Sequence, residues 1–289
     1  MKHLIIAEWR KLSRRPLPWV VLGIVIASVV AVVLGGALLA ISNVITVYDE
    51  NDNATNAAAI LPSFTLPGAI PMTLSVVRQV GTWLLIIFVA ISIGMEESYG
   101  TLRIMLSTGL DRTRYLLAKL IVLIGFTIFI AVSGFATGCI SALAVGALSP
   151  TTMTPEPVEG SVFWMSLTML VRTIGILCLP VVLAFTITVL SRSQTLGLSI
   201  TLGYFIFDIL VSSVSAFMGN AGEIVRTLLI GSSSTAIMQL NRLGQPMTLT
   251  ESWSTVAPNV LVLTTYVVIL LFGCRYVFTH RDITSGTSS

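Results

Sequence analysis

Residues 95–115 read MEESYGTLRIMLSTGLDRTRY, and they separate two long apolar runs. The stretch is unusual because only 10% of the 289 residues are charged, whereas 55% are hydrophobic. Soluble domains carry about 25% charged residues, so the composition predicts a membrane protein. We interpret residues 95–115 as a segment outside the lipid, to which a soluble partner binds. Its charged residues are Glu96, Glu97, Arg103, Asp111, Arg112 and Arg114.

The apolar runs on both sides of this stretch are long enough to cross a bilayer, whose core of about 30 Å takes about 20 helical residues. Six such runs predict an all-α polytopic membrane protein with six transmembrane helices. The expected spans are 17–41, 76–95, 115–148, 162–190, 195–218 and 256–278. They form one transmembrane domain, 17–278, followed by a polar tail at 279–289. In the third span, Gly134 and Gly138 have the G-x-x-x-G spacing that favours close helix contact.

The N-terminal segment, 1–16, is basic and amphipathic. Ile5, Trp9 and Leu12 recur at helical spacing, which puts them on one face of a helix. Basic amphipathic helices with tryptophan on the apolar face lie at membrane surfaces. We therefore expect an interfacial helix that is broken at Pro16, with a merely charged leader as the alternative.

Residues 219–255 combine polar residues with apolar patches at 224–230 and 236–240. Both patches are too short to cross the membrane. We expect two short re-entrant or interfacial helices here, before the sixth span.

Six spans place both termini on the same side of the membrane, and the basic residues indicate which side. Twelve of the 16 Lys and Arg residues fall on the side of the termini, and cytoplasmic loops carry such an excess. We therefore expect a multi-pass protein with residues 95–115 and both termini in the cytoplasm. As a separate expectation, its location is a plasma membrane, of a bacterium. The four basic residues elsewhere are Arg78, Arg172, Arg226 and Arg242.

Sequence motifs for catalysis and for cofactor binding are missing. There is no G-x-x-x-x-G-K-[ST] loop for ATP. The cysteines form no C-x-x-C pair, and the two histidines lie at opposite ends of the chain, so we predict no metal site. The sequence contains no basic module with interleaved aromatic residues, so it does not predict nucleic-acid binding. We expect a protein that is not an enzyme and has neither catalytic residues nor a cofactor of its own.

Two ionisable residues interrupt the apolar runs, Arg172 in the fourth span and Asp208 in the fifth. Charged groups inside membrane helices are rare and usually functional. At 1.5 Å per residue, Arg172 lies about 27 Å from the inner end of its span, and Asp208 lies about 20 Å from the inner end of its own. We hypothesise that Arg172 and Asp208 pair. Alternatively, Arg172 extends outward and Asp208 faces a water-filled cavity.

The motif between the second and third spans resembles that of the ABC-2 type permeases, the membrane subunits of ABC exporters. Similar features are the basic segment at 8–12 and the short turn at 190–193, so the resemblance covers essentially the whole chain. The matching residues are Glu96, Glu97, Gly100, Thr101, Leu102, Arg103, Leu106, Ser107, Arg112 and Lys119.

The resemblance implies a separate ABC ATPase subunit that binds ATP and Mg, a second permease copy in a homodimer or heterodimer, and a lipid bilayer. It also implies a cytoplasmic coupling helix at about 99–107 that docks on the ATPase. Hydrolysis by the partner would then drive efflux of a drug, an antimicrobial peptide or a lipid-like substrate. The predicted docking residues are Glu96, Glu97, Tyr99, Gly100, Thr101, Arg103, Leu106 and Arg112.

Two other functions remain open. The chain could be an ion-coupled secondary transporter that uses Asp208, or a membrane immunity or sensor protein that transports nothing.

Overall fold

The computed structural model describes residues 2–42, 47–48, 54–55, 57–98, 112–148, 160–215, 217–239 and 249–280. Apart from short turns, these residues are helical, with one antiparallel pair of two-residue strands, β1 (Val47–Tyr48) and β2 (Ala54–Thr55). The helices are α1 (Lys2–Ser13), α2 (Pro16–Ile41), η1 (Ala57–Phe64), α3 (Ala69–Ser98), α5 (Arg112–Leu148), α6 (Gly160–Ser191), α7 (Gln194–Ser215), α8 (Asn220–Leu228), α9 (Ile230–Gln239) and α10 (Leu249–His280).

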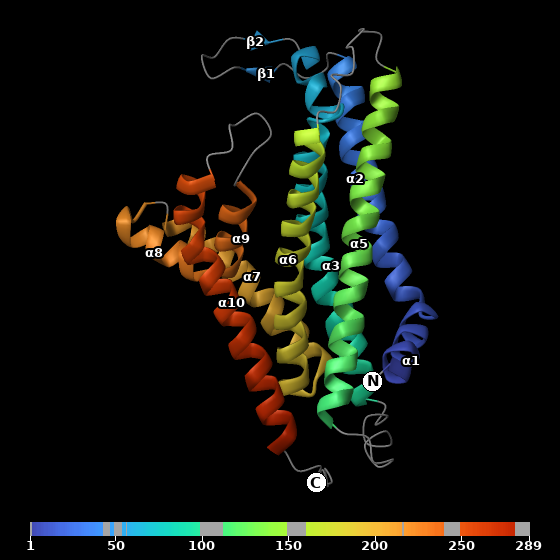
Figure 1. Cartoon of the computed structure of the whole chain (residues 1–289), viewed down its shortest axis with the longest axis vertical. Helices are drawn as coiled ribbons and strands as arrows, with labels where there is room; N and C mark the ends of the chain where they lie inside the picture. The colour runs from blue at the N-terminus through green and yellow to red at the C-terminus, as the bar shows by residue number, and fades with distance from the viewer. Residues whose placement is uncertain are drawn as a thin grey trace.

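Six of these helices, α2, α3, α5, α6, α7 and α10, are long and apolar enough to cross a membrane. This confirms the predicted all-α fold with six spans. The long helices run side by side, and α1 lies at the end of the bundle where α10 finishes (Figure 1). The short helices α8 and α9 lie toward the other end, beside α7 and α10 (Figure 1).

The centre of the bundle is α3, which packs against α2, α5, α6 and α7. Its side chains Leu74, Leu85 and Phe88 are completely buried. By contrast, α7 and α10 leave large apolar side chains such as Phe207 and Phe272 exposed. Exposed apolar surface of this extent is expected of helices that face lipid.

The predicted contact face at Gly134 and Gly138 lies against α3. A Cβ atom at Gly134 would lie 2.6 Å from Cγ2 of Val77, and one at Gly138 would overlap the side chain of Thr73. Since neither position has room for a methyl group, the two glycines let α5 approach α3 closely.

Several helix ends differ from the expected spans. Helix α3 begins at Ala69 rather than near residue 76, because Pro71 lies in its first turn, where a missing N–H removes no hydrogen bond. Helix α7 ends at Ser215, three residues before the predicted end. Helix α10 begins at Leu249 rather than at 256, and Pro258 lies inside it. The two short helices expected between 219 and 255 are α8 and α9; their placement in the membrane interface stays a prediction.

Candidate functional site

A buried group of polar side chains joins α1, α3 and α5 at the end of α3. Glu96 is only 4% exposed. Its Oε1 accepts a hydrogen bond of 2.6 Å from Nζ of Lys11, and its Oε2 accepts one of 2.5 Å from the hydroxyl of Tyr115. Nζ of Lys119 forms an ion pair with the same Oε2. We call Glu96, Lys11, Tyr115 and Lys119 the Glu96 cluster.

The two partners on α5 occupy one face of the helix, because Tyr115 and Lys119 are four residues apart. Tyr115 is 2% exposed and Lys119 is 5% exposed. The Lys119 ammonium also lies 5.8 Å from the centre of the Tyr115 ring, within the range of a cation–π interaction. An ammonium so far from water requires a negative partner, and Glu96 supplies it.

Helix α1 contributes a second carboxylate next to this cluster. Glu8 is buried, and a small gap beside it is lined by Lys11, Arg15, Glu96 and Lys119, among others. Burial raises the pKa of the Glu8 carboxyl, and the charge of Glu96 raises it further. The basic neighbours Lys11, Lys119 and Arg15 lower this pKa, but the net shift is upward.

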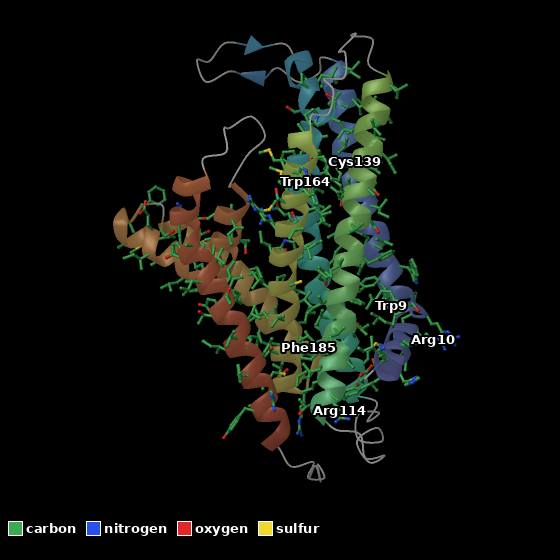
Figure 2. The ribbon with its side chains drawn as sticks, in the orientation of Figure 1. Trp9, Arg10, Arg114, Cys139, Trp164 and Phe185 are labelled. Atoms are coloured by element: carbon green, nitrogen blue, oxygen red, sulfur yellow. The ribbon has the colours of Figure 1, made fainter. Side chains whose placement is uncertain are left out.

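The packed face of α1 therefore differs from the predicted apolar face. Leu12 is buried as expected, and Ile5 is partly buried against the core. Trp9 is exposed over 41% of its surface, although its ring approaches Gly125 of α5, and Arg10 extends away from the bundle (Figure 2). The charged Glu8 is buried toward the bundle, which the spacing of apolar residues did not indicate.

The predicted docking residues fall into three groups. Glu96 is described in full, and its carboxylate binds groups of this chain rather than pointing to a partner. Glu97 and Arg112 belong to the ends of α3 and α5, but their side chains lie outside the described part of the structure. Outside the described residues altogether are the expected coupling helix at 99–107 and its residues Tyr99, Gly100, Thr101, Arg103 and Leu106.

Of the two intramembrane charges, Asp208 has a different partner from the one hypothesised. It is 2% exposed, and its Oδ2 accepts a hydrogen bond of 2.6 Å from the backbone amide of Gly231. Its Oδ1 accepts a longer one, 3.4 Å, from the hydroxyl of Ser232. No ion pair joins Asp208 to Arg172, which interacts elsewhere. The pairing hypothesis is therefore wrong: Asp208 bonds to the first turn of α9 and makes no ion pair with Arg172.

Asp208 does line a cavity, as the alternative hypothesis expected; that the cavity holds water stays a prediction. The cavity has a volume of about 240 Å³ and lies between α3, α6, α7 and α9. Its lining combines polar and apolar residues: Arg78, Gln79, Thr82, Trp83, Ile176, Pro180, Phe205, Asp208, Ile209, Ser212, Ile230, Gly231, Ser232, Ser234 and Thr235. We call it the Arg78 cavity.

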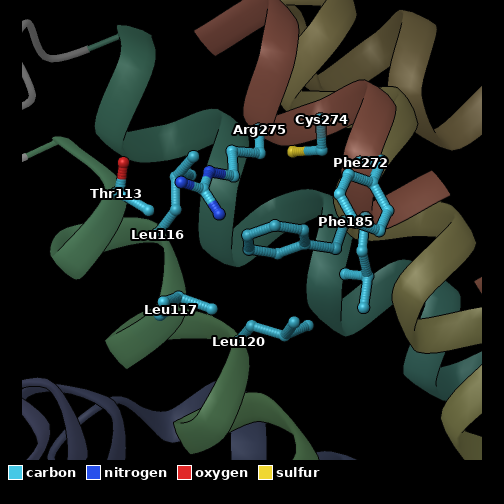
Figure 3. Close-up of a pocket in the computed structure, with 9 residues that line it drawn as sticks. Thr113, Leu116, Leu117, Leu120, Phe185, Phe272, Cys274 and Arg275 are labelled. Carbon is cyan, nitrogen blue, oxygen red and sulfur yellow. The ribbon is translucent and has the colours of Figure 1, made fainter. Parts of the chain in front are cut away.

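A second cavity, of about 200 Å³, lies between α5, α6 and α10 near the end where α10 finishes. Figure 3 shows Phe185 reaching between leucines of α5 and Phe272 of α10, with the guanidinium of Arg275 at one side. The lining is otherwise almost entirely hydrocarbon. Such a pocket suits an apolar chain and offers no group for acid–base chemistry.

Within the described part of the chain, no three His, Cys, Asp or Glu side chains are grouped closely enough to hold a metal ion. A family model described as ABC-2 family transporter protein matches residues 4–208. The match runs from α1 to Asp208, so it includes the Glu96 cluster and most of the residues around the Arg78 cavity. A search of curated proteins found no match.

Proposed function

Since the chain belongs to the ABC-2 family of transporter proteins and has six helices able to span a membrane, we propose that it is the permease subunit of an exporter driven by a separate ABC ATPase. The ATPase binds ATP and Mg, and this chain supplies the path across the membrane. The proposal places the chain in the plasma membrane of a bacterium, with both termini in the cytoplasm. It also includes a second permease copy, identical or related.

The observation that carries this proposal is the Glu96 cluster. The segment 99–111 connects the end of α3 to the start of α5, and the cluster ties both helices together beside that segment. Breaking a buried ion pair by removing one partner costs about 3–5 kcal/mol. A force applied to 99–111 is therefore passed to α3 and α5 together, and through Lys11 to α1.

This arrangement gives the predicted docking residues different roles. Glu96 holds the base of the connecting segment in place. The proposed contacts with the ATPase come from the segment itself and its edges, through Glu97, Tyr99, Gly100, Thr101, Arg103, Leu106 and Arg112. The resulting motion of α3 moves one wall of the Arg78 cavity, and this is how we propose that hydrolysis is coupled to export.

The alternative of an ion-coupled transporter based on Asp208 receives less support. A coupling carboxylate must bind and release its ion. Asp208 has a structural role, because it accepts hydrogen bonds from α9, and the family match favours the ATP-driven class of transporter.

The proposal can be tested with the tagged full-length chain, cross-linked in its native membrane before extraction. We expect a subunit with a phosphate-binding loop to co-purify and to hydrolyse ATP. Arg103→Glu should reduce its recovery by about tenfold, which corresponds to a loss of about 1.4 kcal/mol. Arg192→Glu, in the turn between α6 and α7, is the matched control and should leave recovery unchanged. The proposal fails if the wild-type chain brings down no ATP-hydrolysing subunit.

A further inference from the structure

The Arg78 cavity is lined by a cation that forms no ion pair with any residue in the described part of the chain. Arg78 lies nine residues from Ala69, or about 14 Å along α3, inside a membrane-crossing helix. Its Nε atom is buried and has no hydrogen-bond partner. None of the ion pairs between described residues involves Arg78. Buried N–H groups are normally satisfied, so the unsatisfied Nε of this partly buried side chain, beside a cavity, points to a ligand that supplies the acceptor.

The cavity lining also presents acceptors, one on α3 itself and the others on α7 and α9. Oγ1 of Thr82 donates its proton to the carbonyl of Arg78 (2.7 Å), Oγ of Ser212 to that of Ile209 (3.0 Å), and Oγ1 of Thr235 to that of Gly231 (2.9 Å). Because these protons are already engaged, the hydroxyl oxygens offer only lone pairs to the cavity. Asp208 adds a carboxylate, which has about four lone-pair sites and uses two of them on α9.

The cavity is thus charged at two places and neutral in sum, with Arg78 on α3 and Asp208 on α7. A ligand that matches this cavity carries an anionic group, which pairs with Arg78. It also carries a positively charged hydrogen-bond donor, which binds Asp208 and the hydroxyl oxygens. Trp83, Ile176 and Phe205 line the rest of the space, and they suit the carbon atoms that join or extend the two groups.

We propose that the Arg78 cavity binds a zwitterionic group, with its phosphate or carboxylate against Arg78 and its primary ammonium against Asp208. That this zwitterionic group binds in the cavity is a proposal about this chain alone. That it belongs to the exported substrate rests on the proposed function. An aminophospholipid head group and a free phosphate or carboxylate zwitterion share this chemistry.

The test is native mass spectrometry of the full-length chain released from detergent, with lysophosphatidylethanolamine as the probe. Lysophosphatidylcholine is the matched probe, because its trimethylammonium has the same charge but no N–H donor. We expect the wild-type chain to bind the ethanolamine lipid about tenfold more tightly. Equal binding of the two lipids overturns the proposal, and this comparison needs no variant.

Variants then test whether the probe binds in the Arg78 cavity. Arg78→Gln and Asp208→Asn should each weaken binding of the ethanolamine lipid by about tenfold, while Arg78→Lys should retain most of it. Arg172→Gln is the control, because Arg172 lies in a spanning helix but does not line the cavity. Unchanged binding by a folded Arg78→Gln chain overturns the assignment.

A last arm identifies the source of the ligand. Phosphoethanolamine, which has no acyl chain, displaces the lipid if the natural ligand is a soluble zwitterion, and fails to displace it if the ligand is a lipid. Both results support the shared chemistry. Since no ATPase is present in these measurements, their failure leaves the proposed coupling untouched.

Discussion

The backbone amide of Gly231 donates a 2.6 Å hydrogen bond to Oδ2 of Asp208, so a carboxylate well inside α7 binds the first turn of α9. The first N–H groups of a helix have no partner within the helix, and a carboxylate satisfies them and opposes the positive end of the helix dipole. Tyr204 adds to this attachment, since its hydroxyl accepts a hydrogen bond of 3.3 Å from the amide of Ile230. The intramembrane acid thus holds a short helix in place.

Asp208→Ala should loosen the start of α9. Loss of a capping group costs about 0.5–2 kcal/mol. We expect faster hydrogen exchange at the amides of Gly231 and Ser232, measured by mass spectrometry. Asp208→Asn keeps an acceptor oxygen and should have a smaller effect. Ser232→Ala, which removes only the 3.4 Å contact, is the control. Unchanged exchange in Asp208→Ala would show that the carboxylate does not hold α9.

Glu96→Gln should destabilise the protein strongly, because it leaves the Lys119 ammonium buried without a negative partner. Removing one partner of a buried pair costs about 3–5 kcal/mol. The double variant Glu96→Gln with Lys119→Met should recover part of this loss, since neither member of the buried pair is then charged. Thermal unfolding in detergent measures both effects. Lys11→Met should be milder, because the Lys11 side chain is 32% exposed; additive effects in the double variant would contradict the buried pair.

The attachment of α1 should weaken as the pH rises. Burial raises the pKa of Glu8 above its ordinary value of 4.5, so the folded protein holds this proton more tightly than the unfolded chain does. The resulting stability is fully present below pH 4.5 and is lost as the pH rises through the folded-state pKa.

The side chain of Glu8→Gln stays uncharged at every pH, so this variant should lose the pH dependence. At pH 7 the amides of its α1 should be better protected than those of the wild type. Hydrogen exchange at two pH values, corrected for intrinsic rates, measures the effect. Glu223→Gln, an exposed glutamate of α8, is the control. A wild-type α1 that becomes more protected with rising pH would contradict the assignment.

Gly138→Ala should separate α5 from α3, because the new methyl group overlaps the side chain of Thr73. Overpacking of this kind costs about 1–3 kcal/mol. Gly146→Ala on the same helix is the control, since nothing lies within 4 Å of its Cβ position. The midpoint of thermal unfolding should fall for the first variant and stay level or rise for the second. Equal midpoints would mean that α5 and α3 do not need this close contact.

The six spans were predictable because each exceeds the length at which an apolar run can cross lipid, and the charges between them are few. A close helix contact at Gly134 and Gly138 was predictable from their spacing, but its partner helix, α3, was not. The early start of α3 was not, since Pro71 indicates a break as often as a first helical turn.

The partners within both sites were not predictable from the sequence. Lys11 reaches Glu96 across 85 residues, and nothing local connects the two. The hypothesis for Asp208 considered only charged side chains, but its partner is a backbone amide, which every residue except proline carries. That Arg78 forms no ion pair with another described residue also became evident only from the arrangement of the helices.

The 2.6 Å hydrogen bond between Lys11 and Glu96 connects α1 to the end of α3. Helix α1 carries an exposed Trp9 and an Arg10 that extends outward, side chains that are typical of helices at lipid head groups (Figure 2). Glu96 stands at the beginning of the segment that we propose an ATPase moves. Under the proposed coupling, a change in the surface charge or tension of the bilayer that displaces α1 would also displace Glu96 and α3, so the rate of transport would depend on the composition of the membrane.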